Sequence, residues 1–200
     1  MITYTAAMLL TGAVRADRPL IVVALPEEAA HLRTDLPILL TGVGKVQAAT
    51  AVASLLSEGP RPTKIINLGT AGALRAGLTG TFEVSKVIQH DFNSVALLAV
   101  TGHLFGTPLE LAGEGLVLAT GDVFVSDPVL RESLAEQAHL VDMEGYAVAS
   151  AAAARGVGVQ MIKHVSDDAS DGAGAGWSTT VDACARELAA WLASHPEGAA

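Results

Sequence analysis

A chain of 200 residues can bury about 70% of the surface that its unfolded form exposes, so it needs no disulfide or metal to fold. Hydrophobic residues make up 50% of the chain and charged residues 16%, a balance that excludes a mainly disordered protein. The 21 acidic residues outnumber the 12 basic ones, and the resulting net charge of −9 argues against binding to DNA or RNA.

Two further features predict where the protein resides. Its single cysteine, Cys184, cannot form an internal disulfide or a cysteine-based metal site, which favours a reducing compartment, the cytoplasm. The apolar stretch over residues 1–14 has no basic start, and nowhere do about 18 apolar residues follow one another. We therefore expect neither a secretory signal nor a membrane span.

Short apolar runs alternate with alanine-rich segments of helical spacing. The runs predict strands over Pro19–Leu25, Pro37–Val43, Lys64–Leu68, Thr81–Gln89, Gly115–Ala119, His139–Met143 and Val157–Val165. The spaced segments predict helices over Lys45–Leu56, Pro128–Ala138, Glu144–Arg155 and Ser178–Ala193. Residues 94–113 are the least periodic stretch. The alternation predicts one α/β domain over residues 1–200, with helices on both faces of a sheet.

Carboxylates follow four of the predicted strands: Glu27 and Glu28, then Asp122, then Glu144, then Asp167 and Asp168. Ligands bind outside the carboxyl ends of strands in such sheets, because loops and helix N-termini converge there. Helix capping explains any one of these acids at least as well. It explains less well why several costly carboxylates gather at one edge of an apolar chain. The sequence therefore predicts a binding site at this edge.

Six short motifs occur along the chain: ALPEE (24–28), TGVGKVQAA (41–49), IINLGTAGAL (65–74), TGDVFV (120–125), VDMEGYAVA (141–149) and HVSDDAS (164–170). In this order they resemble the motifs of the purine nucleoside phosphorylase superfamily and, within it, of the methylthioadenosine/S-adenosylhomocysteine nucleosidases. The resemblance implies a three-layer fold with a mixed, twisted central sheet. It also implies hydrolysis of a purine nucleoside, above all a 5′-modified adenosine, with release of the free base.

The resemblance assigns separate roles to three acids. Cleavage of an N-glycosidic bond passes through an oxocarbenium-like sugar, so the departing base needs a proton and the nucleophile needs activation. By resemblance, Asp167, oriented by Ser166, protonates N7 of the purine, and Glu28 activates the attacking water. Glu144 accepts hydrogen bonds from the ribose hydroxyls and favours the developing positive charge.

The resemblance also implies residues that contact the substrate without reacting. Met143 precedes the ribose-binding glutamate, Phe124 stacks on the purine, and the backbone of Val125 reads the edge of the base. Trp177 takes the place of a phenylalanine over the 5′ substituent, where an aromatic ring suits an apolar tail. For Phe124 and Met143, an ordinary place in the core is the alternative interpretation.

Two of the three acids depend on the register of their motifs. A displacement of one residue would put Glu27 in place of Glu28, or Asp168 in place of Asp167. The motif register favours Glu28 and Asp167, because these are the residues that match the acids of the family.

Two further patterns do not predict a metal or cofactor site. Lys45 in the segment GVGK suggests a phosphate loop, but the first glycine and the Ser or Thr of that motif are missing. The six histidines show no metal-binding spacing. We therefore expect no metal and no cofactor.

The nucleophile is predicted from three positions. Phosphorylases of this type place an arginine where this chain has Asn67, which favours water over phosphate. In the nucleosidases a serine and an arginine position that water, and Thr70 and Lys163 take their places here. Lysine keeps the charge but loses the planar guanidinium, so a different water geometry or a phosphate stays an alternative.

The middle of the chain departs from the family pattern. Between Asp91 and Thr120 it is shorter than in the relatives, in which this region forms the dimer contact and part of the neighbour's 5′ pocket. Kinship implies a homodimer with a small nucleoside substrate, and the 5′ group stays open. The alternative functions are a purine nucleoside phosphorylase, a futalosine hydrolase and a nucleoside-binding protein without turnover.

Overall fold

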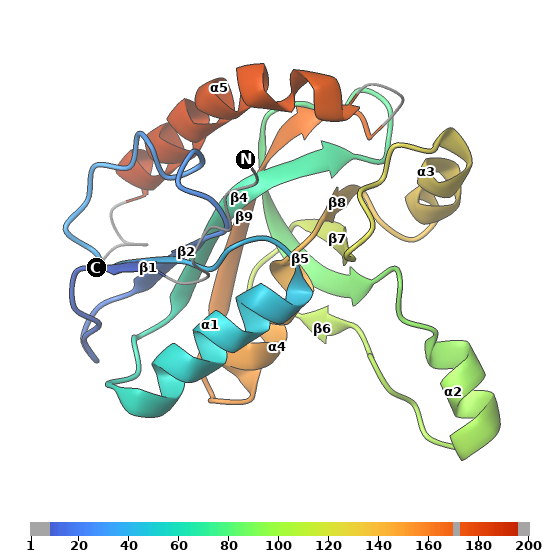
Figure 1. Ribbon diagram of the computed structural model, residues 1–200, viewed down its shortest axis with the longest axis horizontal. Coiled ribbons are helices and arrows are strands. Elements are labelled where there is room, and N and C mark those ends of the chain that lie inside the picture. Colours follow the sequence, from blue (N-terminus) through green and yellow to red (C-terminus); the bar gives the residue numbers. More distant parts are fainter. Residues whose placement is uncertain (1–8, 170–172, 196–200) are drawn as a thin grey trace, which may run out of the picture.

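The computed structural model describes residues 9–169 and 173–195, with side chains over 10–169 and 179–195 (Figure 1). The strands are β1 (Leu9–Thr11), β2 (Leu20–Val23), β3 (Ile38–Leu40), β4 (Ile65–Ala73), β5 (Thr81–Gln89), β6 (Leu109–Glu110), β7 (Leu116–Thr120), β8 (Leu140–Asp142) and β9 (Val159–Asp167). The helices are α1 (Lys45–Glu58), α2 (Ser94–Thr101), α3 (Pro128–Ala135), α4 (Gly145–Ala153) and α5 (Ala173–Ser194).

The described strands form one nine-stranded sheet with parallel and antiparallel pairs. On one side, β2 pairs in parallel with both β3 and β4. On the other side the strands form a ring: β4 pairs with β8, β8 with β7, β7 with β5, β5 with β9, and β9 again with β4. The long strands β4 and β9 run side by side in parallel through the centre of the molecule (Figure 1).

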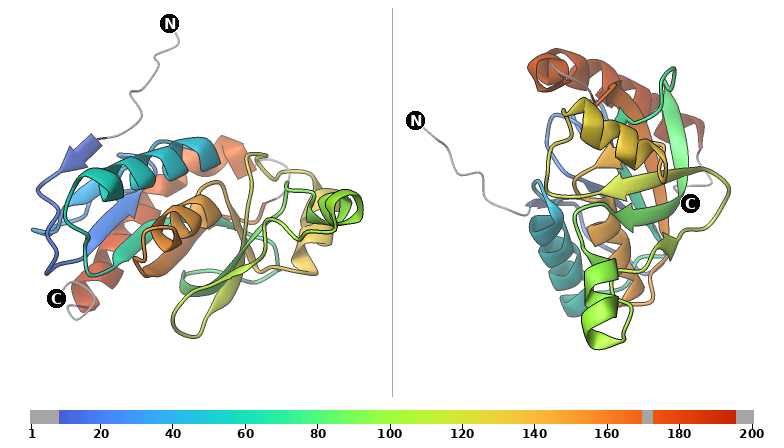
Figure 2. Two further views of the ribbon diagram at one scale, coloured as in Figure 1. Left: turned by 90° about the horizontal axis from the view of Figure 1, so that it is seen from below. Right: turned by 90° about the vertical axis from the view of Figure 1, so that its right-hand side faces the viewer.

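Two hydrophobic clusters place helices on opposite faces of the sheet. Along β2, Leu20 and Val22 pack in the cluster with α1 and α4, whereas Ile21 and Val23 pack in the cluster with α5. This alternation follows from the period of two in a strand, and it requires apolar residues at every position because both faces are covered. Figure 2 shows α5 on one side of the sheet and α1 with α4 on the other. The predicted α/β layers are confirmed.

Several elements differ from the prediction in length. The third predicted strand, residues 64–68, continues as β4 to Ala73, so residues 69–72 belong to a strand and do not form a loop. The last predicted strand, residues 157–165, continues in β9 through Asp167. The reason is pairing: residues 69–72 of β4 bond with β9, which keeps both chains extended. Beyond the prediction, β1 and β6 lie at the two edges of the sheet.

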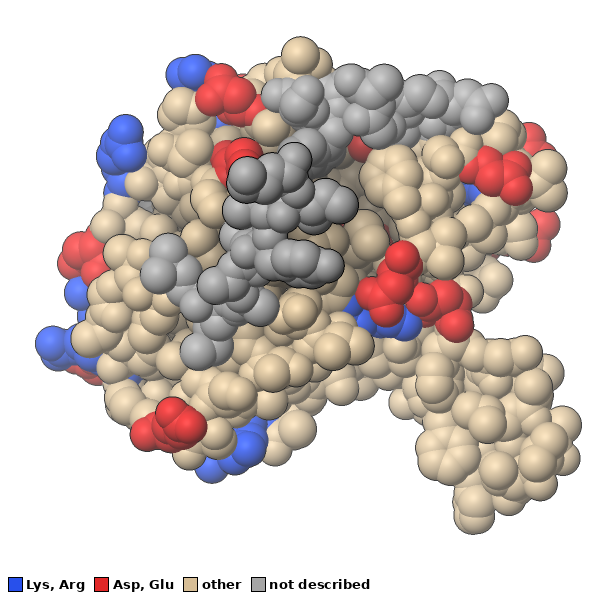
Figure 3. Space-filling view, in the orientation of Figure 1, with Lys and Arg blue, Asp and Glu red and all other residues tan. Residues whose placement is uncertain are grey.

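The least periodic stretch of the sequence forms a projecting arm. Its helix α2 begins after Asn93, whose side chain accepts a hydrogen bond from the amide of Ala96, and it has no buried residue. Val95 and Val100 are 79% and 84% exposed. In Figures 1 and 3 α2 extends away from the rest of the molecule, and the face seen in Figure 3 shows no acidic or basic side chain around it. None of the helices in residues 9–169 and 173–195 combines the length and apolarity that a membrane span requires.

Candidate active site

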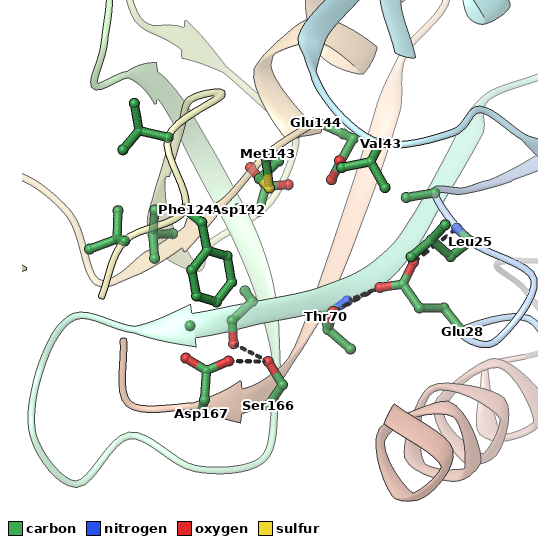
Figure 4. Close-up of a pocket in the computed structure, with 16 residues that line it drawn as sticks. Leu25, Glu28, Val43, Thr70, Phe124, Asp142, Met143, Glu144, Ser166 and Asp167 are labelled. Atoms are coloured by element: carbon green, nitrogen blue, oxygen red, sulfur yellow. Dashed lines mark hydrogen bonds between the residues drawn. The ribbon is translucent and has the colours of Figure 1, made fainter. Parts of the chain in front are cut away.

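A cavity of about 270 Å³ opens where β4, β8 and β9 meet the loops after β2, β3 and β7. This size is close to the lower end of the range for small-molecule sites, about 300–1,000 Å³. Figure 4 shows the lining, which includes four carboxylates and several apolar side chains. The lining residues that bear on the chemistry are Glu28, Val43, Thr70, Val123, Phe124, Val125, Asp142, Met143, Glu144, Ser166 and Asp167.

Glu28 lies in the loop after β2 and is only 4% exposed. Its Oε1 accepts hydrogen bonds from the backbone N of Thr70 (2.7 Å) and from the Oγ1 of Thr70 (2.8 Å). Its Oε2 accepts from the backbone N of Leu25 at 3.2 Å. None of these donors lies at a helix N-terminus, so Glu28 does not cap a helix. The carboxylate is fixed at the cavity wall by β4.

Ser166 and Asp167 both line the cavity although they are adjacent in β9. Neighbouring side chains in a regular strand point to opposite faces. Here the register with β4 shifts, so that Gly72 faces Asp167 and Ser166 is the extra residue of a bulge. Consequently the Oγ of Ser166 donates to the Oδ2 of Asp167 at 2.7 Å (Figure 4), and the amide of Ala169 donates to its Oδ1 at 2.9 Å.

Glu144 directly precedes α4 but does not cap it, because its side chain makes no hydrogen bond to that helix. Its Oε1 instead accepts from the backbone N of Gly44, 2.8 Å away at the start of α1. Burial raises the pKa of Glu144 to about 8, and the charge of Asp142 adds to the rise, against the opposing influence of Lys163 and of the Gly44 hydrogen bond. Met143 lines the cavity beside it (Figure 4).

Lys163 does not line the cavity, and its ammonium binds Asp142, which does. The Nζ of Lys163 lies 2.9 Å from the Oδ2 of Asp142, which also accepts from the amide of Gly145 at 2.8 Å. The Oδ1 of Asp142 accepts from the Oγ1 of Thr120 at 2.6 Å. Burial alone would lower the pKa of Lys163, but the charges of Asp142 and Glu144 raise it. Lys163 therefore contacts the lining through Asp142, and its charge also acts on Glu144.

Asp142 is the one carboxylate of the described lining that was not predicted from the sequence. Its signal was present, since it is a carboxylate at the end of an apolar strand and lies two residues before Glu144. What a sequence cannot display is its partner, because Lys163 comes from β9, which pairs with β4 separately from β8.

The base-binding residues predicted from the sequence form an apolar wall of the cavity. Phe124 lines it and is 50% exposed, so it is not a core residue, whereas Val125 lines it and is 4% exposed. Val43 contributes a further apolar side chain (Figure 4). The predicted contact of Trp177 with the 5′ group lies outside the described side chains.

The structure distinguishes between neighbouring acids. Glu27 and Asp168 are exposed and do not line the cavity, in contrast to Glu28 and Asp167. Asn67, at the position of the phosphorylase arginine, is buried and donates from Nδ2 to the carbonyl of Val22 at 3.0 Å. It does not line the cavity either.

The lining of the cavity contains no Lys or Arg among the described residues. Its formal charge at neutral pH is therefore negative. Glu144 contributes little to that charge, because with a pKa of about 8 it mostly keeps its proton at neutral pH. Over the described part of the chain, no group of three or more His, Cys, Asp and Glu is arranged to hold a metal ion. The arrangement suits proton transfer and the binding of a neutral or cationic ligand.

Comparison with known proteins places this arrangement in a family. A family model described as the phosphorylase superfamily matches residues 31–109 and 113–194. The chain belongs to the phosphorylase superfamily. It is 29% identical over 177 residues to the 5′-methylthioadenosine/S-adenosylhomocysteine nucleosidase of Geobacillus kaustophilus, an alignment that covers 76% of this chain and 75% of that protein. The enzyme of the same name from Bacillus thuringiensis is 33% identical over 156 residues, covering 65% of this chain and 67% of the relative.

Solved structures agree with this membership of the phosphorylase superfamily at the level of the fold. The 5′-methylthioadenosine/S-adenosylhomocysteine nucleosidase of Helicobacter pylori superposes with a TM-score of 0.78 at 22% identity, over 94% of this chain and 99% of that one. The futalosine hydrolase of the same organism gives 0.78 at 21% identity, over 91% and 98%. The resemblance predicted from the six motifs is confirmed.

Proposed function

We propose that this protein hydrolyses the N-glycosidic bond of a purine nucleoside, with a 5′-modified adenosine such as methylthioadenosine or S-adenosylhomocysteine as its substrate. The observation that carries the proposal is that Glu28, Glu144 and Asp167, far apart in the chain, line one cavity of nucleoside-like size. The nucleosidases among its relatives support the same assignment.

In this proposal Asp167 supplies the proton that makes the base a neutral leaving group. Ser166 donates a hydrogen bond to one of its oxygens and the amide of Ala169 donates to the other, so the carboxyl group is held in place at the cavity. Phe124 offers a stacking surface for the purine beside it, and the backbone at Val125 offers polar atoms for the edge of the base.

Water is held and activated on the opposite part of the wall. Glu28 is fixed by Thr70 through two hydrogen bonds, so its carboxylate keeps its orientation while it accepts a proton from water. Glu144, when ionised, accepts hydrogen bonds from the ribose hydroxyls and stabilises the positive charge that develops on the sugar. Its neighbour Asp142 adds a negative charge that Lys163 balances from behind.

Water is preferred to phosphate as the nucleophile on electrostatic grounds. A phosphate dianion needs cationic groups or several backbone donors, and the described lining offers four carboxylates without a Lys or Arg. The ammonium of Lys163 is already bound to Asp142 at 2.9 Å. Phosphorolysis would place like charges together.

The test is to incubate the protein with methylthioadenosine, S-adenosylhomocysteine, adenosine, inosine and futalosine, each with and without inorganic phosphate. Free base and sugar products are followed by chromatography. We expect free adenine and the unphosphorylated 5′-modified ribose at a rate that does not depend on phosphate. Pentose 1-phosphate would identify a phosphorylase, preference for futalosine would change the substrate, and binding without base release would contradict catalysis.

The proposal has three further parts. The protein acts as one domain over residues 1–200, it resides in the cytoplasm, and it forms a homodimer. The projecting helix α2 has no buried residue, and its exposed Val95, Leu98 and Val100 are apolar side chains that a second copy would cover. Sedimentation velocity of the purified protein decides the oligomeric state, with a mass of twice the chain expected.

A further inference from the structure

Lys45, which is not part of a phosphate loop, has two acidic partners at the start of α1. Its Nζ lies 2.5 Å from the Oδ1 of Asp91 and 3.9 Å from the Oδ2 of Asp122. The side chains of Lys45 and Asp91 are only 19% and 20% exposed, so the pair is shielded from most of the solvent. Such a pair is held more tightly than an ordinary surface ion pair.

Backbone hydrogen bonds close these contacts into a triangle. The amide of Lys45 donates to the Oδ1 of Asp122 at 2.8 Å, and the amide of Asp122 donates to the Oδ2 of Asp91, also at 2.8 Å. Each of the three residues is therefore bonded to both others. They come from three segments, at the start of α1, after β5 and after β7, and we call the group Lys45–Asp91–Asp122 the clasp.

The clasp lies next to the apolar wall of the cavity without lining it. Val43 lies two residues before Lys45, and Val123 and Phe124 follow Asp122 directly. These three side chains line the cavity, yet they are 44%, 52% and 50% exposed, so core packing does not fix them. Figure 4 shows Val43 and Phe124 at separate parts of the wall, with Met143 between them in this view.

Gly44 connects the clasp to the reacting groups. Its φ is 92°, and a Cβ at this position would lie 3.1 Å from the Oδ1 of Asp122, so the close approach of the two loops requires glycine. The amide of Gly44 donates to Glu144. The amide of the very next residue, Lys45, donates to Asp122. One turn of backbone thus binds both the proposed ribose carboxylate and the clasp.

We propose that the clasp is a positioning device for the bound nucleoside: it holds the segment that carries Val43 and the segment that carries Val123 and Phe124 in a fixed position relative to each other. Lys45, Asp91 and Asp122 are positioning residues, since none of them lines the cavity. Because both segments are held in place before the substrate arrives, less free energy is lost in ordering them on binding. This inference rests on the proposed function for the identity of the ligand.

The test compares Lys45→Met and Asp91→Asn with the wild-type protein, using methylthioadenosine in steady-state kinetics and in calorimetric binding. Loosening the two segments weakens ground-state and transition-state binding alike. We therefore expect KM and Kd to rise about tenfold while kcat changes less than about threefold. Lys45→Arg retains the charge and restores most of the affinity. Lys45→Met combined with Asp91→Asn is expected to add little to either change, because both remove the same contact.

Lys86→Met is the matched control, since it breaks the surface pair of Lys86 with Glu110 on β5 and β6 and is expected to leave KM unchanged. Thermal unfolding of each variant shows whether it folds, and the isosteric Asp91→Asn carries the test if Lys45→Met does not. An unchanged KM and Kd in folded Asp91→Asn, or a loss confined to kcat, overturns the clasp.

Failure of the proposed function gives a different result. A wild-type protein that binds nucleoside without releasing base removes hydrolysis, and the ratio of Kd between variant and wild type then decides the clasp alone. A wild-type protein that binds no nucleoside removes both proposals.

Discussion

The ammonium of Lys163 and the carboxylate of Asp142 form an ion pair of 2.9 Å in which the two side chains are only 3% and 2% exposed. A charge removed from water is costly unless its partner and further hydrogen bonds compensate. Asp142 has such bonds, because Thr120 and the amide of Gly145 also donate to it. The pair therefore couples β8, β9 and the start of α4 directly behind the cavity.

Lys163→Met is expected to destabilise the protein by about 3–5 kcal/mol, because the variant leaves the carboxylate of Asp142 buried without its counter-charge. Lys163→Arg keeps the charge and should cost less. The measurement is the free energy of unfolding in urea. Lys86→Met, which removes the exposed partner of Glu110, is the control, with an expected loss of about 0–1 kcal/mol. Equal losses in the two methionine variants would contradict the importance of the buried pair.

Glu144 is expected to make the stability depend on pH. Its pKa is about 8 in the folded protein against 4.5 as the ordinary value, so the folded state binds the extra proton between these limits. The stabilisation is fully present below about pH 4.5 and is lost as the pH rises toward 8, by at most about 1.4 kcal/mol per pH unit. Urea unfolding across this window should show a steeper decline for the wild type than for Glu144→Gln. Parallel curves would contradict the assignment.

The same ionisation is expected in the pH profile of catalysis. The ionised form of Glu144 binds the ribose in the proposed mechanism, and kcat/KM reports the ionisation of the free enzyme. We therefore expect kcat/KM for methylthioadenosine to rise with pH to a midpoint near 8. A profile without a rising limb between pH 6 and 9 would assign this role to another group.

Asp167→Asn is expected to reduce turnover by about 10²–10⁴-fold with an unchanged thermal unfolding midpoint, because an amide does not donate the proton that a carboxylic acid donates. The neighbouring Asp168→Asn serves as the matched control, since Asp168 is exposed and does not line the cavity. The measurement is base release under saturating nucleoside. Loss of activity in Asp168→Asn alone would assign the role of the acid to Asp168.

Gly72→Ala is expected to lower kcat by about 10- to 100-fold, because small displacements of a reacting group have effects of this size. The added Cβ would lie 3.1 Å from the Oδ1 of Asp167 and 3.2 Å from both Ala169 and Val141, so it presses on the acid from a crowded position. Gly158→Ala is the control, since a Cβ there meets nothing within 4 Å. Comparable rates in the two variants would show that the acid tolerates the displacement.

Much of the fold and of the candidate site can be predicted from local patterns in the sequence. The strands after which Glu28 and Glu144 occur are short apolar runs, and the chain order of strands and helices predicts that their ends meet at one edge. The roles of these acids stay predictions. The buried position of Glu28 also fits a simple rule, because a carboxylate inside an apolar chain needs donors, and Thr70 provides them.

The parts of the site that the sequence does not predict depend on pairing between distant segments. The bulge at Ser166 arises from the register between β4 and β9, which no short stretch of sequence encodes. The pairing of Lys163 with Asp142 and the clasp of Lys45 with Asp91 are contacts over long sequence separations. Helix α2 has no buried face, so it lacks the periodicity by which an amphipathic helix is recognised.

The bulge in β9 has a consequence for how such a protein diversifies. Asp167, the proposed proton donor, belongs to a hydrogen-bonded ladder at the centre of the molecule, whereas the hydrophobic rim of Val43, Val123 and Phe124 belongs to loops open to solvent. Changes in the rim can therefore alter which nucleoside fits while the donor keeps its orientation. New substrate preferences are then accessible without rebuilding the chemistry.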